Sequence, residues 1–127
     1  MIYGVGTDIL SLERLSRILE HDGGFAKGVY TPRELELIRS RPEPLCCYAT
    51  RFAGKEAVFN ALRLDGNTRW TQIEILSEPD GAPRVQLHGG AARYAAARGV
   101  AVVRLSLSYE DKYACAFAVA LVEESGR

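Results

Sequence analysis

The stretch that decides the fold is RFAGKEAVFNAL, residues 51–62. Its apolar residues recur at helical spacing, and we predict a helix over about residues 45–64. Alanine at every fourth position would let another segment of backbone approach this helix closely. Lys55 and Glu56 nevertheless place two charges in the middle of the apolar run. A helix that only needed to be buried would have no use for them.

Glu56 occupies a defined stripe of the predicted helix. At 3.6 residues per turn it aligns with Phe52, Phe59 and Arg63, and Asn60 lies on the edge of this stripe. A carboxylate between two phenylalanines loses hydration, so a cation should compensate it. The candidate cations are the neighbouring lysine, Arg63 and a metal ion.

Asp8 is the second candidate acid. The opening MIYGVGTDIL, residues 1–10, alternates apolar and small residues and predicts a strand that ends near Asp8. Its Gly-Val-Gly lacks the third glycine of a dinucleotide-binding loop, and no parallel crossover unit follows, so we exclude that class. Two carboxylates, with water and substrate phosphate oxygens, are a common way to hold Mg²⁺. The alternative is that Asp8 caps a turn and Glu56 forms a surface ion pair with its neighbours.

The whole pattern predicts a single α+β domain over residues 1–127, with a mainly antiparallel sheet packed against helices. The clearest local signal is Thr31-Pro32-Arg33-Glu34, which combines a capping box with proline at the first helical position. The predicted elements are a strand from residue 1 to near Asp8, helices over 11–20, 31–40 and 45–64, strands over 71–76 and 84–88, a helix over 89–98, and strands over 100–108 and 113–122.

Composition excludes several classes of protein. Sixteen basic and sixteen acidic residues balance, which gives no general attraction to nucleic acid. No run approaches the roughly 20 apolar residues of a membrane span. The cysteines, Cys46, Cys47 and Cys115, form no C-x-x-C pair, so we expect buried, reduced thiols in a cytoplasmic protein.

Four segments, taken together, resemble the holo-acyl-carrier-protein synthases, which are short, single-domain 4′-phosphopantetheinyl transferases. They are GTDIL at 6–10, RFAGKEA at 51–57, IEIL at 73–76 followed by DGAPRVQLHG at 80–89, and SLSYEDKYACAFAVAL at 106–121. Enzymes of this family move the phosphopantetheine arm of coenzyme A to a serine of an apo acyl carrier protein and release 3′,5′-ADP. The resemblance also implies a role in fatty acid biosynthesis.

The resemblance implies a role for each matching residue of the cofactor site. Asp8 and Glu56 would bind Mg²⁺ over the pyrophosphate of coenzyme A, which would explain the charge at position 56. Phosphoryl transfer depends mainly on charge neutralisation and in-line positioning. The further contacts implied for coenzyme A are Arg51 and Lys55 at its phosphates, Pro83 near its adenine, and Ser108 and Tyr109 in a cleft between the subunits of a homotrimer. A structural ion pair is the alternative role for Arg51.

The first helix would meet the acidic carrier protein. On this interpretation Arg14 and Arg17 provide charge contacts, and Ile18 and Phe25 provide apolar ones. The alternative for the two arginines is an ordinary solvated helix face.

Three positions depart from the family pattern. The lysine of K-E-A-x-x-K is replaced by Asn60, the Gly-Thr-Gly loop is replaced by RLDGNTR, which retains only Gly66, and a frequent histidine is replaced by Tyr109. Asparagine supplies no charge. We hypothesise that Arg63, two turns after Glu56, supplies the missing charge and takes part in catalysis.

The departures leave more than one function open. The leading interpretation is an active transferase. The second is a weakened paralogue that binds coenzyme A or a carrier protein without efficient transfer, and the third is a structural trimer subunit with a vestigial site. The last strand, apolar on both faces, indicates either a central strand or one at a subunit interface.

Overall fold

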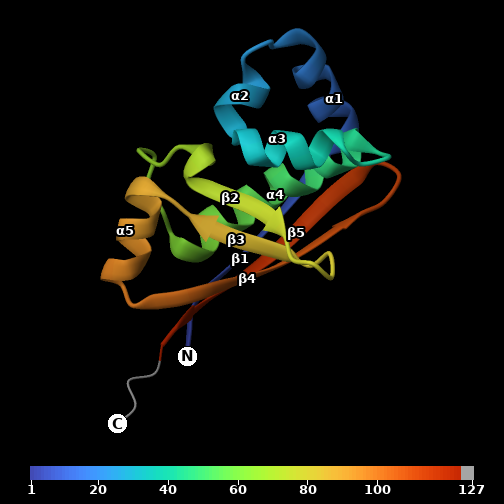
Figure 1. The fold of residues 1–127 in the computed structure, drawn as a ribbon. Coiled ribbons are helices and arrows are strands. Elements are labelled where there is room, and N and C mark those ends of the chain that lie inside the picture. The colour runs from blue at the N-terminus through green and yellow to red at the C-terminus, as the bar shows by residue number, and fades with distance from the viewer. Residues whose placement is uncertain (124–127) are drawn as a thin grey trace.

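The computed structural model describes residues 1–123 and contains two sheets packed around a long helix, α4. Figure 1 shows α1, α2 and α3 gathered at one end of the larger sheet and α5 at the other. The elements in chain order are β1 (Ile2–Ser11), α1 (Leu12–His21), α2 (Phe25–Val29), α3 (Pro32–Arg39), α4 (Pro44–Leu62), the 3-10 helix η1 (Trp70–Gln72), β2 (Ile73–Ser77), β3 (Pro83–Leu87), α5 (Gly89–Ala97), β4 (Val100–Tyr109) and β5 (Tyr113–Val122).

The larger sheet has the strand order β1-β5-β4, and β2 pairs with β3 in a separate hairpin. All the strand pairs formed within residues 1–123 are antiparallel. The predicted α+β fold class is therefore confirmed. The final strand, β5, is the central strand of its sheet.

Side-chain caps form at the starts of α1 and α3. The Ser11 hydroxyl accepts a hydrogen bond from the Arg14 amide at the start of α1, and Thr31 and Glu34 form the predicted capping box of α3. Helix α4 ends two residues earlier than its apolar pattern suggests, because Arg63 adopts the left-handed conformation, with φ 57° and ψ 47°. The side chain of Arg63 therefore leaves the stripe that contains Glu56.

Two short elements were missed by the sequence pattern. Helix α2 has only five residues, and its N-cap residue Gly24 provides no side-chain hydrogen bond. The 3-10 helix η1 likewise lacks a side-chain cap. Without caps or a full helical period, such segments look like loops in a sequence.

Glycines of β1 allow α4 to lie directly on this strand. A Cβ atom on Gly4 would lie 2.1 Å from the Ala61 carbonyl oxygen, and one on Gly6 would lie 2.0 Å from that of Ala57. The Gly-Val-Gly segment is thus a packing surface, in agreement with the exclusion of a dinucleotide loop. This close approach brings the middle of β1 alongside the second half of α4.

The sheet has one covered face and one open face. On β5, Ala114, Ala116, Ala118 and Ala120 are buried, whereas the alternate residues face outward. The exposed large apolar residues of the three strands are Ile2, Val5, Ile9, Tyr109, Tyr113 and Phe117.

The expectation that all three cysteines are buried is wrong for Cys115, which is exposed on this outer face, while Cys46 is half-buried. The reason is the alternation of β5, which turns every second side chain away from α4. Among the helices of residues 1–123, none has the length and apolar character that a membrane crossing requires.

Candidate active site

The structure brings Asp8 and Glu56 together. Asp8 lies on β1 opposite Ala116 of β5, and Glu56 lies near the middle of α4. Burial is the largest cause of a raised Glu56 pKa, and together with a hydrogen bond to Asp8 and the Asp8 charge it brings that pKa to about 8. Glu56 therefore retains a proton at neutral pH that an exposed glutamate would have lost.

One oxygen of the pair lacks a partner. The Oδ2 atom of Asp8 is buried and accepts no hydrogen bond within residues 1–123. Burying a carboxylate oxygen without a partner reduces the stability of the folded state unless a ligand binds to that oxygen. An oxygen of this kind beside a second carboxyl group suits a hard divalent cation, so the residues present fit Mg²⁺.

The protein offers few side-chain ligands for a metal ion at this site. Within residues 1–123, no group of three or more histidine, cysteine, aspartate or glutamate side chains could hold a metal ion. A zinc site built wholly from protein side chains is therefore not formed there. Two carboxylates leave several positions of a magnesium ion for water and phosphate oxygens.

A second polar feature is a pocket of about 280 Å³ lined by Arg51, Arg41, Cys46 and Tyr109, among others. Arg51 and Arg41 both donate to the Ser77 hydroxyl, at 3.0 Å and 3.2 Å. Neither guanidinium lies within 4 Å of a carboxylate of residues 1–123. The predicted alternative of a structural ion pair for Arg51 is therefore not what the structure shows.

Arg51 is buried, with 8% of the residue exposed, and its Nε atom has no hydrogen-bond partner within residues 1–123. Burial lowers the pKa of Arg51, and the nearby Arg41 acts in the same direction. Two adjacent guanidinium groups without an ion-pair partner suit an anionic ligand, although Glu43 also lines this pocket. Pro83 pairs with Ser77 across the hairpin and so lies beside these two arginines.

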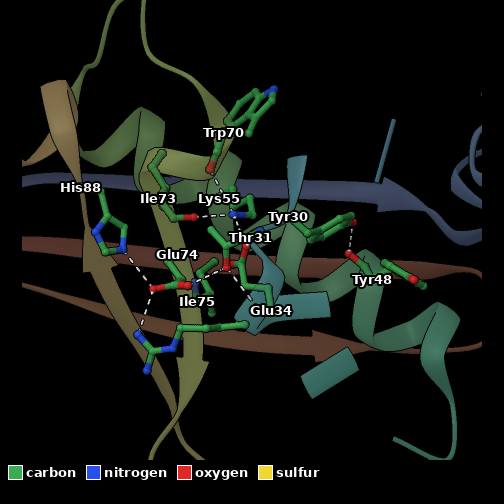
Figure 2. A network of polar contacts seen from close by, with 11 residues as sticks. Tyr30, Thr31, Glu34, Tyr48, Lys55, Trp70, Ile73, Glu74, Ile75 and His88 are labelled. Atoms are coloured by element: carbon green, nitrogen blue, oxygen red, sulfur yellow. Dashed lines mark hydrogen bonds and ion pairs between the residues drawn. The ribbon is translucent and has the colours of Figure 1, made fainter. Parts of the chain in front are cut away.

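Lys55 is not placed as a phosphate contact. It has no exposed surface, and its ammonium group donates to the Glu34 carboxylate at 2.8 Å and to the carbonyls of Trp70 and Ile73 (Figure 2). These three bonds use all three of its N–H groups. The expectation that Lys55 contacts coenzyme A therefore conflicts with the structure, in which it ties α4 to α3 and to β2.

The contact with Glu34 continues into a polar network. Figure 2 shows the Glu74 carboxylate between Thr31 and His88. The distance from Glu74 Oε2 to Thr31 Oγ1 is 2.6 Å, and that from Glu74 Oε1 to His88 Nε2 is 3.0 Å. Burial opposes ionisation of Glu74, but these contacts and the nearby Arg33 leave its pKa below the ordinary value. Sequence reasoning recognised Glu34 only as part of a capping box and missed Glu74, because the other partners of these two residues lie 14 to 43 residues away.

Arg63 is also misplaced by the sequence argument. Its guanidinium lies 4.3 Å from the centre of the Tyr3 ring, at the start of β1. Tyr3 is five residues before Asp8, or roughly 16 Å along an extended strand. The structure therefore contradicts the hypothesis that Arg63 supplies charge beside Glu56.

Asn60 and Gly66 lie at the surface after Glu56. The Asn60 amide is exposed and donates to the Thr7 carbonyl at 3.4 Å, so it lies beside the Asp8 end of β1. Gly66 is exposed in the loop that follows α4, with open space around it. Neither residue brings a charge to the carboxyl pair.

Ser108 and Tyr109 point to different sides of β4. Ser108 pairs with the outward-facing Cys115, and Tyr109 pairs with the buried Ala114 and lines the arginine pocket. Nearby Glu43 is the main cause of the raised pKa of the Tyr109 hydroxyl.

The residues predicted to meet a partner lie on or near α1. Arg14, Arg17 and Ile18 are exposed, and the exposed fraction of Ile18 is 37%. Phe25 is half-buried and packs edge-on against Phe52, with ring centres 5.6 Å apart. Phe25 therefore contributes to the core as well as to the surface beside α1.

Known proteins share this fold and length. Residues 4–118 match the family model described as the 4′-phosphopantetheinyl transferase superfamily. A holo-[acyl-carrier-protein] synthase of Desulforudis audaxviator is 45% identical over 123 residues, which cover 95% of this chain and 94% of the relative. A relative of the same name from Magnetococcus marinus is 39% identical and covers 97% and 94%.

Solved structures agree with the sequence relatives. The holo-[acyl-carrier-protein] synthase of Neisseria meningitidis has a TM-score of 0.87 and 34% identity, covering 95% of this chain and 99% of that one. An acyl carrier protein synthase of Plasmodium yoelii with ADP bound has a TM-score of 0.88 and 30% identity, covering 98% of each chain.

The fold thus defines an α+β protein in which the Asp8 and Glu56 side chains interact. The chain belongs to the 4′-phosphopantetheinyl transferase superfamily. The family resemblance and the enzyme class inferred from the sequence are confirmed.

Proposed function

We propose that this protein transfers the 4′-phosphopantetheine arm of coenzyme A to a serine of an apo acyl carrier protein in a Mg²⁺-dependent reaction. The observation that carries this proposal is the Asp8–Glu56 pair, with one unpartnered buried oxygen and a glutamate that is hard to ionise without a cation. Curated relatives named holo-[acyl-carrier-protein] synthase support the substrate and the partner.

The reaction joins the serine oxygen to the β-phosphorus of coenzyme A and breaks the bond from that phosphorus to the bridging oxygen. The leaving group is 3′,5′-ADP. The serine proton passes to a carboxylate of the pair or to a water that the pair holds. Bound between Asp8 and Glu56, Mg²⁺ would supply charge neutralisation at the pyrophosphate.

The arginine pocket would hold an anionic group of the same substrate. Arg51 and Arg41 present two guanidinium groups without an ion-pair partner within residues 1–123, and Pro83 and Tyr109 lie at the same place. Arg41 and Ser77 are therefore additional contact residues that the sequence did not single out.

We further propose that the protein acts as a homotrimer with its substrate between subunits. Positions 51 and 56 are five residues apart and thus point about 140° apart around α4. The arginine pocket and the carboxyl pair consequently open on different sides of the helix. One substrate molecule could contact both an arginine pocket and a carboxyl pair if the two came from different chains. The open apolar face of the sheet provides a surface for such an assembly.

A weakened paralogue is the second candidate function, and Asn60 favours it. The exposed amide of Asn60 lies beside the Asp8 end of β1, where it supplies no positive charge for phosphate. A protein of this kind would bind coenzyme A and transfer its arm slowly or not at all.

Intact-protein mass spectrometry separates the two candidates. An apo acyl carrier protein is incubated with this protein, coenzyme A and MgCl₂, beside a sample with EDTA. We expect a gain of one phosphopantetheine that EDTA abolishes and that Asp8→Asn or Glu56→Gln slows by more than about 100-fold. Circular dichroism and coenzyme A binding show whether each variant is folded. A folded protein that binds coenzyme A but modifies none of several carrier proteins would favour the weakened paralogue.

A further inference from the structure

Helix α1, the surface proposed to meet the carrier protein, carries balanced charge. Its exposed ionic side chains include the cations Arg14 and Arg17 and the anions Glu13 and Glu20. An acidic partner would be attracted most strongly by a helix without these carboxylates.

Glu13 and Arg17 form an exposed ion pair. The Oε1 atom of Glu13 lies 3.9 Å from a guanidinium nitrogen of Arg17, one helical turn away. Both side chains are well exposed, at 82% and 62%, so the pair forms at the surface where a partner would dock. Arg14, in contrast, has no ion pair within residues 1–123.

The surface beside α1 also carries negative charge. A groove of about 620 Å³ runs between α1, the start of α4 and the β4–β5 turn. Its lining includes the carboxylates of Glu13, Glu20, Glu43 and Asp111 and a single cation, Arg17. The field that an approaching protein meets at this edge of α1 is therefore repulsive to acidic groups.

We propose that Glu13 is a specificity-determining residue for the protein partner: by pairing with Arg17 it leaves Arg14 as the free cation of α1 and disfavours strongly acidic carrier proteins. This inference rests on the proposed function, because it assumes that an acyl carrier protein docks on α1. The partner that fits best has a few acidic groups opposite Arg14 and less negative charge opposite the groove. Repulsion against the wrong partner is a common source of specificity.

The test measures binding separately from transfer. A fluorescently labelled apo acyl carrier protein of strongly negative net charge is titrated with this protein without coenzyme A, and anisotropy gives the Kd. We expect Glu13→Gln to lower the Kd about two- to fivefold at low salt, the range of a released surface ion pair. In 0.5 M NaCl the difference should disappear, because exposed charges are then screened.

Two matched variants decide the cause. Glu36→Gln removes an exposed carboxylate of α3 and the same net charge, and should leave the Kd within about 1.5-fold of the unchanged protein. The double variant Glu13→Gln/Arg17→Gln should lose the gain of Glu13→Gln, since the freed guanidinium is then missing. Equal effects of Glu13→Gln and Glu36→Gln, no effect of Glu13→Gln, or a gain that survives in the double variant would each overturn the inference.

The mass-spectrometric transfer assay keeps the two proposals apart. A protein that transfers no phosphopantetheine but binds the carrier more tightly after Glu13→Gln refutes the proposed function and supports this inference. A protein that transfers the arm, with a Kd unaffected by Glu13→Gln, supports the function and refutes the inference.

Discussion

At the scale of single residues, the carboxyl group of Glu56 gives the protein an unusual dependence on pH. Its pKa of about 8 lies above the ordinary glutamate value of about 4.3. At pH values between these two pKa values, Glu56 holds a proton in the folded state that it has released in the unfolded state. The free energy of unfolding of the metal-free protein therefore falls as pH rises through this range.

We expect the melting temperature in EDTA to decrease from pH 5 to pH 9 through this group. The slope per proton is at most about 1.4 kcal/mol per pH unit, and partial exposure of Glu56 makes it smaller. Glu56→Gln should remove this contribution, and thermal melts of both proteins across the pH series measure it. MgCl₂ favours the charged carboxylate, so its stabilising effect should be larger at pH 8.5 than at pH 6. Equal effects at both pH values would contradict the assignment of the metal to Glu56.

Lys55 supports a second residue-scale prediction. Lys55→Met leaves the Glu34 carboxylate buried without its ammonium partner, which should cost about 3–5 kcal/mol of unfolding free energy. Lys27→Met, at an exposed lysine, should change stability by less than about 0.5 kcal/mol. Urea denaturation of both variants provides the comparison. A Lys55→Met protein of normal stability with weakened coenzyme A binding would instead restore the phosphate-contact role expected from the sequence.

At the scale of elements, the contact between β1 and α4 determines whether Asp8 meets Glu56. A Cβ atom on Gly6 would overlap the Ala57 carbonyl, which is backbone and cannot move aside alone. We expect Gly6→Ala to destabilise the protein by about 1–3 kcal/mol or more and to reduce Mg²⁺-dependent transfer. Gly28→Ala meets open space in α2 and should be neutral or slightly stabilising. Thermal melts and the transfer assay test both variants, and a fully active, stable Gly6→Ala protein would show that β1 and α4 can separate without loss of the site.

Elements with a local signal could be read from the sequence, and those that depend on distant contacts could not. The Thr31–Glu34 capping box, the hairpin and the strand before Asp8 each have a signature within a few residues. The carboxyl pair was also named, although only the family resemblance joined its members. The role of Lys55 was hidden because Glu34 lies 21 residues away. Arg63 was misplaced because a helical wheel cannot show where the last turn becomes left-handed.

At the scale of the whole molecule, the open face of the β1-β5-β4 sheet tests the proposed assembly. Phe117 lies on the central strand of this face with an exposed fraction of 50%. We expect Phe117→Asp to dissociate the trimer into folded monomers, because a charge would be buried at the interface. Sedimentation velocity compares it with Ala97→Asp, an exposed change on α5 that should leave the assembly intact. An unchanged protein that sediments as a monomer would refute the trimer.

The pairing of β1 with β5 has a consequence for synthesis on the ribosome. Gly6 aligns with Ala118 of β5. More than 100 further residues must therefore be translated before the strand that pairs with β1 is available. During that time a nascent chain carries an apolar strand without a hydrogen-bonding partner, and such strands are prone to aggregate. Helix α4 has been translated after about half of the chain. Because the glycines of β1 let α4 pack closely on this strand, the helix can cover β1 before β5 is made. We therefore expect the helix to protect the first strand until the sheet can close, and slow translation beyond α4 should do little harm to the yield of folded protein.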